Sequence, residues 1–374
     1  MNTSKPIPIL ITLPNFLTAG SGGKVMEIVE GIDRRRFEPT ICVLKRGGRI
    51  YEKLLNQKFS IIEDNFIISV KPYSSFLRRA WQAAQPFRQG NYQLWHSYNY
   101  SDDYSEPIIA RFAGARNWVY TKKNMNWGGR SWHMRTFLAS RILARNSDML
   151  KMFFSSPIYK KKVRLAPAGV NTIRFNPNVF PGKKITQIFN IPKNNIIVGT
   201  VSHLVPIKGH SIIIKALSVI NNVHFIVAGK PLDSNYTEYL KKLSYEIGLD
   251  NRVIFLGDIT DIPEFLAEID IFLFPTLQKG EGCPLALLEA MSSGKPCIGT
   301  DVPGIRDVIE HGKNGLLIPP QNPEAMATAI RTLIGSPNLR KSLGAAARQR
   351  ILNNFTLEKD IGAHMEIYEE LLSR

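Results

Sequence analysis

The chain has 374 residues, 44% hydrophobic and 21% charged, which is the composition of a soluble globular protein large enough for two domains. No apolar run approaches the ~20 residues that a membrane-spanning helix needs, and the apolar stretch at residues 7–13 is too short for a signal peptide. Three scattered cysteines, Cys42, Cys283 and Cys297, argue against a disulfide framework and predict a cytoplasmic protein.

The net charge of +17 is concentrated in the first half of the chain. Residues 1–178 hold 28 basic and 11 acidic residues, whereas residues 179–374 hold 20 of each. A basic surface attracts phosphates, nucleic acid or acidic lipid surfaces, so the first half is the one expected to meet such a partner.

Strand and helix signals alternate along the first half. Residues 7–13 form a predicted buried strand, a glycine-rich turn runs to Gly23, and a helix follows at residues 24–33. Later strands are predicted at 39–44, 95–98 and 117–120, with a helix at 106–113. Strand, turn, helix and strand in this order begin a doubly wound parallel sheet.

The second half repeats the alternation more clearly. Strands are predicted at 196–201, 224–228, 253–256, 271–274 and 296–300, with helices at 211–220, 236–247, 262–268, 323–333 and 358–373. Residues 164–177 lack periodicity and indicate a linker region. We therefore predict an N-terminal domain of residues 1–170, a linker of 171–180, a C-terminal domain of 181–355 and a final helical segment of 356–374.

The most informative motif places Glu281 and Glu289 eight positions apart around a helix start. Pro284 suits the first helical position, and the helix's free N–H groups near Gly282 and Cys283 make an anion site. Acids beside a phosphate cradle fit a ligand that carries hydroxyls as well, such as a nucleotide sugar. The alternatives are an ordinary helix with two solvated carboxylates, or a carboxylate pair for glycoside hydrolysis.

This motif resembles the donor-site signature of family 4 of the retaining GT-B glycosyltransferases, and the resemblance extends unevenly over nearly the whole chain. It implies two doubly wound Rossmann-like domains facing across a cleft, with the last helix returning to the N-terminal domain. It also implies that Glu289 binds the donor's ribose and that Glu281 contacts the donor sugar. Backbone groups around Gly282, Cys283, Pro284 and Leu285 would hold sugar and phosphate.

The resemblance also assigns a diphosphate clamp in the loop after residues 196–201. Lys208 matches the family's lysine, whereas His203 stands where the family has arginine and offers a weaker grip. A surface lysine and a structural histidine are the alternatives for these two positions.

In the N-terminal domain, Gly22 and Gly23 resemble the glycine pair that lets the backbone approach the donor phosphate, although a plain turn is an alternative. His96 is expected to face the cleft as a catalytic residue beside Tyr98 and Tyr100, unless it is a satisfied core histidine. Lys123 stands where many family members have a second cleft histidine, and is expected to replace its hydrogen bond to the sugar.

The resemblance implies a retaining hexosyltransferase, and we expect it to be metal-independent and without a cofactor, with Lys208 and a helix N-terminus stabilising the departing phosphate. The expected partners are a nucleotide-diphosphate sugar and a glycan or lipid-linked acceptor of cell-envelope polysaccharide synthesis. A GT-B sugar-nucleotide epimerase and a catalytically weak nucleotide-sugar-binding protein remain as alternatives. Nucleic-acid binding has no recognised motif to support it.

The basic first half also predicts a peripheral location on the inner face of the plasma membrane. Residues 73–88 interleave Phe76, Trp81 and Phe87 with arginines at 78, 79 and 88, a pattern suited to lipid headgroups. Residues 151–164 add Lys151, Lys160, Lys161, Lys162 and Arg164. An ordinary solvated basic face is the alternative.

Overall fold

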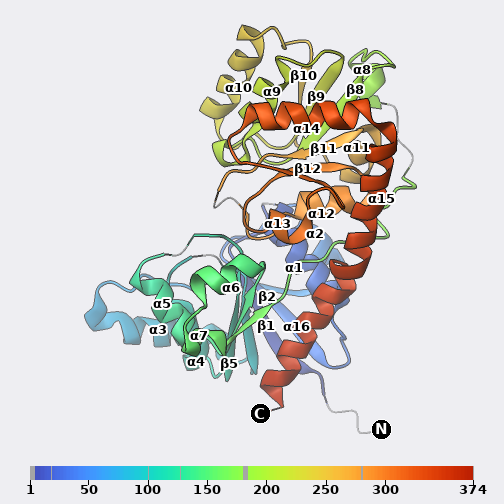
Figure 1. The fold of residues 1–374 in the computed structure, drawn as a ribbon. Helices are drawn as coiled ribbons and strands as arrows, with labels where there is room; N and C mark the ends of the chain where they lie inside the picture. The colour runs from blue at the N-terminus through green and yellow to red at the C-terminus, as the bar shows by residue number, and fades with distance from the viewer. Residues whose placement is uncertain are drawn as a thin grey trace. The chain divides into compact units, whose positions relative to one another are not determined.

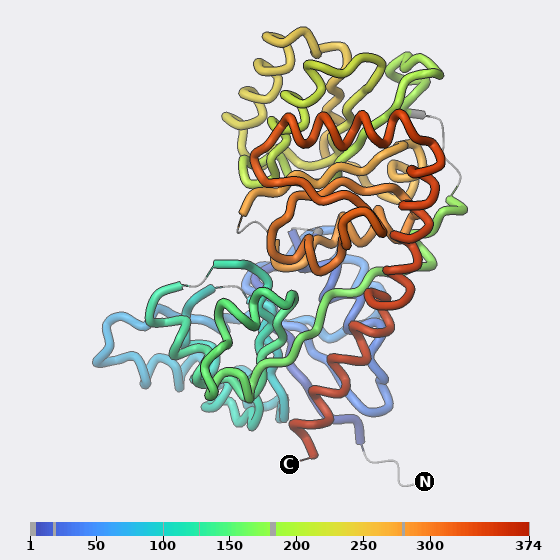
Figure 2. The backbone as a smooth tube through the Cα atoms, in the orientation of Figure 1, coloured from blue at the N-terminus to red at the C-terminus, as the bar shows by residue number. Residues whose placement is uncertain are grey.

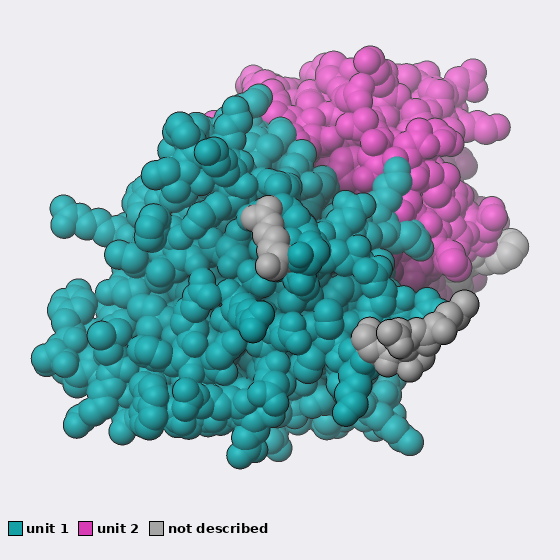
Figure 3. Space-filling view, turned by 90° about the horizontal axis from the view of Figure 1, so that it is seen from below, with its two compact units in different colours: residues 1–167, 358–374 teal, residues 168–357 magenta. Residues whose placement is uncertain are grey.

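A computed structural model describes residues 5–17, 19–99, 101–126, 128–179, 184–278 and 281–373, with the backbone alone at Ala19 and Lys184. The chain divides into two compact units, coloured in Figure 3. Unit 1 comprises Met1–Pro167 and Glu358–Arg374, and unit 2 comprises Ala168–Leu357. Among the described residues, no helix combines the length and apolar character required to cross a bilayer.

Unit 1 is built on a parallel sheet of seven strands in the order β3-β2-β1-β4-β5-β6-β7. The strands are β1 (Ile7–Leu13), β2 (Phe37–Val43), β3 (Ser60–Glu63), β4 (Leu94–Ser97), β5 (Asn117–Lys122), β6 (Arg141–Ala144) and β7 (Val163–Leu165). The strand order reverses between β1 and β4, and loops at the carboxyl ends of strands at such a switch point bind ligands in doubly wound folds.

Helices cover both faces of this sheet (Figure 1). On one face lie α3 (Tyr73–Arg88), α4 (Ser105–Phe112), α5 (Arg130–Leu138), α6 (Ser147–Phe153) and α7 (Pro157–Lys160). Their apolar side chains share one core with every second residue of the strands, including Trp95 and Trp118. On the other side, α1 (Ala19–Gly31) packs against α2 (Arg49–Asn56) and α16 (Leu357–Leu372).

Unit 2 contains a parallel sheet of six strands in the order β10-β9-β8-β11-β12-β13. The strands are β8 (Ile196–Val201), β9 (Val223–Ala228), β10 (Val253–Gly257), β11 (Ile271–Phe274), β12 (Cys297–Thr300) and β13 (Leu316–Ile318). Strands buried on both faces are mostly apolar runs: β11 is apolar throughout, and β9 is apolar except for His224. The prediction of two doubly wound parallel α/β domains is confirmed.

Two apolar clusters line the two faces of the second sheet. One cluster joins it to α9 (His210–Leu217), α10 (Ser234–Glu246) and α14 (Pro323–Gly335). The other joins it to α8 (Lys184–Ile188), α11 (Ile262–Glu268), α12 (Leu285–Ser292), α13 (Ile305–Val308) and α15 (Pro337–Asn354). Asp233, Asp261 and Asn322 each accept a backbone N–H three residues on, which starts α10, α11 and α14.

The chain leaves unit 1 after β7 and returns to it through α16, as the tube in Figure 2 shows. Where the two crossing segments meet, Val170 donates to Phe355 O at 2.9 Å and Leu357 donates to Val170 O at 3.0 Å. A Cβ on Gly169 would lie 2.0 Å from Thr356 O, so only glycine permits this approach.

Candidate donor site and its relatives

Two loops at the carboxyl ends of adjacent strands in unit 2 bring a cation and an acid together. Lys208 lies on the 3-10 turn η1 (Pro206–Lys208) after β8, and Glu281 follows β11. Their side chains form an ion pair, and Glu281 is only 7% exposed. Thr276 Oγ1 lies 3.4 Å from the same carboxylate oxygen of Glu281. The two residues predicted to handle phosphate and sugar therefore lie in contact although 73 positions separate them.

The approach of these loops depends on a glycine. Gly209 has a φ of +70°, and a Cβ there would lie 2.2 Å from Pro275 O. The backbone bond from Leu277 N to Ile207 O, at 2.9 Å, joins the same two loops. The left-handed backbone at Gly209 thus lets the η1 turn sit directly against the loop after β11, which holds Lys208 beside Glu281.

Burial and the ion pair act in opposite directions on the carboxyl group of Glu281. Burial raises its pKa, and the neighbouring Lys208 and the hydroxyl of Thr276 lower it, with a net shift upwards. The negative charge of Glu281 is therefore sustained by Lys208. A ligand phosphate that drew Lys208 away would leave this acid more easily protonated.

The helix after Glu281 differs in detail from the prediction. α12 begins at Leu285, so Pro284 is its N-cap and not its first residue. The N–H of Leu285 donates to Cys283 O at 3.1 Å and is engaged within the turn. Glu289 lies in the second turn of α12 and is half-buried, and Gly282 and Cys283 precede the helix. The amides of Ala286 and Leu287 are then the first-turn donors of α12.

His203, in the loop after β8, is half-buried, and its Nδ1 is buried without a hydrogen-bond partner in the described part of the chain. Burial lowers its pKa, Lys208 and Lys230 lower it further, and Asp258 opposes them. His203 is therefore neutral at pH 7, with one N–H to donate, where an arginine would carry a permanent charge.

In unit 1, Gly22 and Gly23 lie inside α1, so the prediction that they precede the helix is wrong. Lys123, after β5, donates from Nζ to Ser21 Oγ at 3.0 Å and so lies against the same turn of α1. Burial, with Arg145 and Arg135 nearby, lowers the pKa of Lys123 to about 7. A Cβ on Gly23 would meet nothing within 4 Å, so packing among the described residues does not require glycine there.

The prediction that His96 faces a cleft is wrong. His96 is fully buried, and its ring nitrogens lie 2.7 Å from Tyr368 Oη and 2.8 Å from Thr121 Oγ1. Burial and the nearby His364 lower its pKa well below the ordinary value. His96 is therefore a core histidine with both ring nitrogens hydrogen-bonded, as in the alternative interpretation. Its contact with Tyr368 links α16 to the sheet. Tyr100, named beside it, lies outside the described residues.

A buried network on α16 escaped the sequence prediction. Tyr98 Oη lies 2.7 Å from His364 Nε2, and Asp360 pairs with Arg145 at 2.9 Å. Asp360, His364 and Tyr368 recur every four residues, a polar stripe within an amphipathic helix that could have been noticed. Thr276, two residues beyond β11, also escaped prediction, although its place just after a buried strand is a signal.

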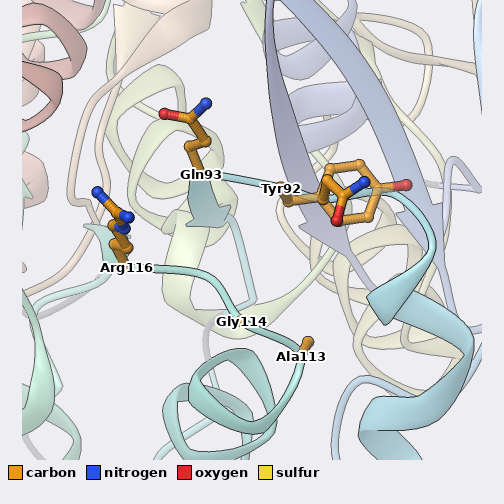
Figure 4. A pocket seen from close by; sticks show the side chains of 6 residues that line it. Tyr92, Gln93, Ala113, Gly114 and Arg116 are labelled. Atoms are coloured by element: carbon orange, nitrogen blue, oxygen red, sulfur yellow. The ribbon is translucent and has the colours of Figure 1, made fainter.

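A separate hollow of about 220 Å³ lies at the amino ends of β4 and β5 in unit 1 (Figure 4). It is lined by Asn91, Tyr92, Gln93, Ala113, Gly114 and Arg116. Gln93 directly precedes β4 and Arg116 directly precedes β5, so this hollow is at the edge of the sheet opposite to Lys123. It contains none of the predicted site residues. Within the described ranges, no three His, Cys, Asp or Glu side chains converge as a metal site.

Several known proteins are similar to parts of this chain. The N-acetyl-alpha-D-glucosaminyl L-malate synthase of Bacillus anthracis is 35% identical over 131 residues, covering 35% of this chain and 34% of that protein. The UDP-Gal:alpha-D-GlcNAc-diphosphoundecaprenol alpha-1,3-galactosyltransferase of Escherichia coli is 26% identical over 240 residues, covering 62% of this chain and 60% of that protein. The matched stretches thus span less than two thirds of either relative.

The solved structure of Anabaena HepE in complex with UDP and glucose has a TM-score of 0.83 to this chain at 21% sequence identity, covering 97% of this chain and 100% of HepE. This likeness over nearly the whole chain confirms the predicted fold of two Rossmann-like α/β domains in the GT-B arrangement. Residues 182–350 match the model of the family Glycosyl transferases group 1. The chain therefore has the GT-B fold, and most of its unit 2 matches the Glycosyl transferases group 1 model.

Proposed function

We propose that this protein transfers a hexose from a nucleotide-diphosphate sugar to a hydroxyl group of a glycan or lipid-linked acceptor, with retention of anomeric configuration. The observation that carries the proposal is the contact between Lys208 and Glu281 at the carboxyl edge of a group 1 domain. A cation for phosphate next to an acid for sugar hydroxyls is what a nucleotide sugar requires and a simple phosphate ligand does not.

The proposed donor contacts involve side chains of unit 2. Lys208 binds the diphosphate, assisted by the first-turn amides of α12 and by a single N–H of His203. The carboxylate of Glu289 accepts hydrogen bonds from the ribose hydroxyls, and Glu281 contacts the hydroxyls of the sugar. In unit 1, Gly22, Gly23 and Lys123 form a second group that serves phosphate or sugar.

The chemical step breaks the bond between the anomeric carbon and the β-phosphate oxygen and forms a bond from that carbon to the acceptor oxygen. The acceptor's proton passes to the departing phosphate on the same face, so no protein base is needed. Lys208 and the N-terminus of α12 stabilise the charge that develops on the phosphate. We propose that these groups make the reaction independent of a metal ion.

We further propose that the acceptor is met at the inner membrane surface, because the basic excess lies in residues 1–178. One relative is named for a diphosphoundecaprenol acceptor, whereas another is named for L-malate, a small soluble acid. The basic excess of unit 1 favours the lipid-linked class.

The first experiment is a thermal-shift screen of the intact protein against UDP, GDP and their hexose derivatives, since a ligand that binds the folded state raises the unfolding temperature. The nucleotide sugar that gives the largest shift is then incubated with EDTA and with acceptors of the glycan and lipid-diphosphate classes. The anomeric configuration of the product is determined by NMR, and a product with the donor's configuration supports the proposal. An inverted product refutes retention, and activity abolished by EDTA refutes metal independence. An isomerised sugar formed from donor alone identifies an epimerase.

A further inference from the structure

The helices on one face of the unit 1 sheet carry an unusual outer surface. Exposed large apolar side chains lie on α3, α5, α6 and α7, which all pack into the same core cluster. They are Tyr73, Leu77, Trp81, Met134, Phe137, Met152 and Ile158. Exposed apolar side chains grouped on one face of a domain often mark an interaction site.

On α3 these residues form a regular stripe. Tyr73, Leu77 and Trp81 are four positions apart and are 66%, 60% and 47% exposed, so they lie along one face of the helix. A different stripe on the same helix, Phe76, Ala80, Ala84 and Phe87, is buried in the core. The core therefore does not account for the exposed stripe.

The structure also corrects which residues of this segment are available to a partner. Phe76 and Phe87, predicted to face headgroups, are core residues. Arg79 is occupied with the loop before α3, donating to Ser69 O at 2.8 Å and to Pro72 O at 3.2 Å. Arg78 is exposed beside Leu77, and Arg88 is exposed at the end of the helix, where its Nε also donates to Phe112 O at 3.1 Å.

The charge on these helices is almost entirely positive. α3, α5 and α7 contain no acidic residue, and α6 contains Asp148 alone. Exposed cations on the same elements and the turn after α7 are Arg78, Arg88, Arg130, Lys151, Lys160 and Lys161. A nucleic acid would satisfy the cations but not the apolar groups, whereas an anionic bilayer surface satisfies both, with rings at the headgroup level and cations at the phosphates.

We infer that the exposed stripe Tyr73, Leu77 and Trp81 of α3 is the membrane-contacting surface of this protein, and that its partner is an anionic lipid bilayer. The inference rests on the proposed function, because it places unit 1 where a lipid-linked acceptor lies. The protein binds the bilayer peripherally. Its apolar side chains enter the membrane–water interface, and the flanking cations add an attraction to the anionic lipids that decreases with salt.

Co-sedimentation with vesicles tests the inference. The intact protein is mixed with vesicles of phosphatidylcholine alone, or of phosphatidylcholine with a quarter of phosphatidylglycerol. We expect binding to the anionic vesicles, weakened by salt, and an affinity about tenfold or more lower in the variant Leu77→Glu/Trp81→Glu. The matched control is Val219→Glu/Tyr245→Glu, which adds the same charge at positions 62% and 75% exposed in unit 2 and should bind as the original protein does.

Three outcomes would overturn the inference: equal binding to both vesicle types, unchanged binding by the stripe variant, or displacement from vesicles by an equal charge of duplex DNA. A second measurement uses the position of Trp81 in a Trp127→Phe background, since Trp95, Trp118 and Trp132 are buried and Trp127 lies outside the described residues. Lipids brominated near the headgroup should quench the fluorescence, and Trp81→Phe should remove most of that quenching. Nucleotide-induced thermal shifts are recorded for every variant. A shift that persists while vesicle binding is absent refutes the membrane surface and leaves the proposed function standing.

Discussion

Replacing Lys208 with alanine removes the cation that faces the nearly buried carboxylate of Glu281. The side chains of Lys208 and Glu281 are 20% and 9% exposed, so the pair is largely withdrawn from water. Removal of one partner of a buried pair costs several kcal/mol because the other charge is left uncompensated, and we expect a loss of ~3 kcal/mol in the free energy of unfolding of unit 2 at pH 8. Turnover should fall ~10²-fold, since Lys208 also stabilises the departing phosphate.

The sign of the pH dependence follows from the raised pKa of Glu281. A carboxyl group whose pKa is higher in the folded than in the unfolded protein favours folding at low pH, and that contribution is lost as the pH rises through the folded pKa. Without Lys208, burial alone acts and the folded pKa rises further. The stability loss in Lys208→Ala should therefore be smaller at pH 5 than at pH 8.

The assay exploits the distribution of tryptophan, because all five lie in residues 81–132 and hence in unit 1. Urea unfolding followed by far-UV circular dichroism reports both units, and tryptophan fluorescence reports unit 1 as the internal control. The double variant Lys208→Ala/Glu281→Gln should recover stability at pH 8 without recovering turnover. Equal losses for Lys208→Ala at both pH values, or no recovery in the double variant, would refute the buried pair. If the double variant recovered turnover, the role of Lys208 would be structural only.

Three further variants test the remaining assignments. Glu289→Ala should raise KM for the donor about tenfold or more with a smaller effect on kcat, because ribose contacts act alike in the ground and transition states; a loss confined to kcat would contradict this. His203→Arg should lower the Kd for nucleotide diphosphate by restoring a permanent charge, measured by calorimetry, and weaker binding would show that the loop faces elsewhere. If charged Lys123 is required, kcat/KM should decline above pH 7, where its pKa of about 7 places deprotonation, and Lys123→Arg should move the decline to higher pH.

Local sequence patterns predicted much of the architecture. The alternation of apolar strands with helical segments predicted both parallel sheets, because strand and helix periodicity are properties of a few consecutive residues. The spacing of Glu281 and Glu289 around a helix start is local in the same sense. The N-terminal boundaries were less certain: Gly22 and Gly23 were placed before α1, since three glycines near its first turn weaken the helix signal.

The tertiary structure decided what distant residues do to one another. His96 is the second-last residue of the buried strand β4, and its neighbours in sequence do not reveal that Tyr368, 272 positions later, occupies the space beside it. The structural roles of Asp360 and His364 likewise depend on distant partners: Asp360 pairs with Arg145, and His364 is hydrogen-bonded to Tyr98. A polar side chain at a strand end can bind a ligand if the space in front of it is open. If another element fills that space, the side chain becomes part of the core. Only the packed fold distinguishes the two cases.

Helix α3 shows the same division between sequence and fold most directly. Its sequence contains two apolar stripes, Phe76, Ala80, Ala84 and Phe87 on one side and Tyr73, Leu77 and Trp81 on another. The sequence by itself determined that the segment is basic and amphipathic. It did not determine which stripe is buried, because a helix on the surface of a domain packs one side against its neighbours, and here the contacts with α4 select that side.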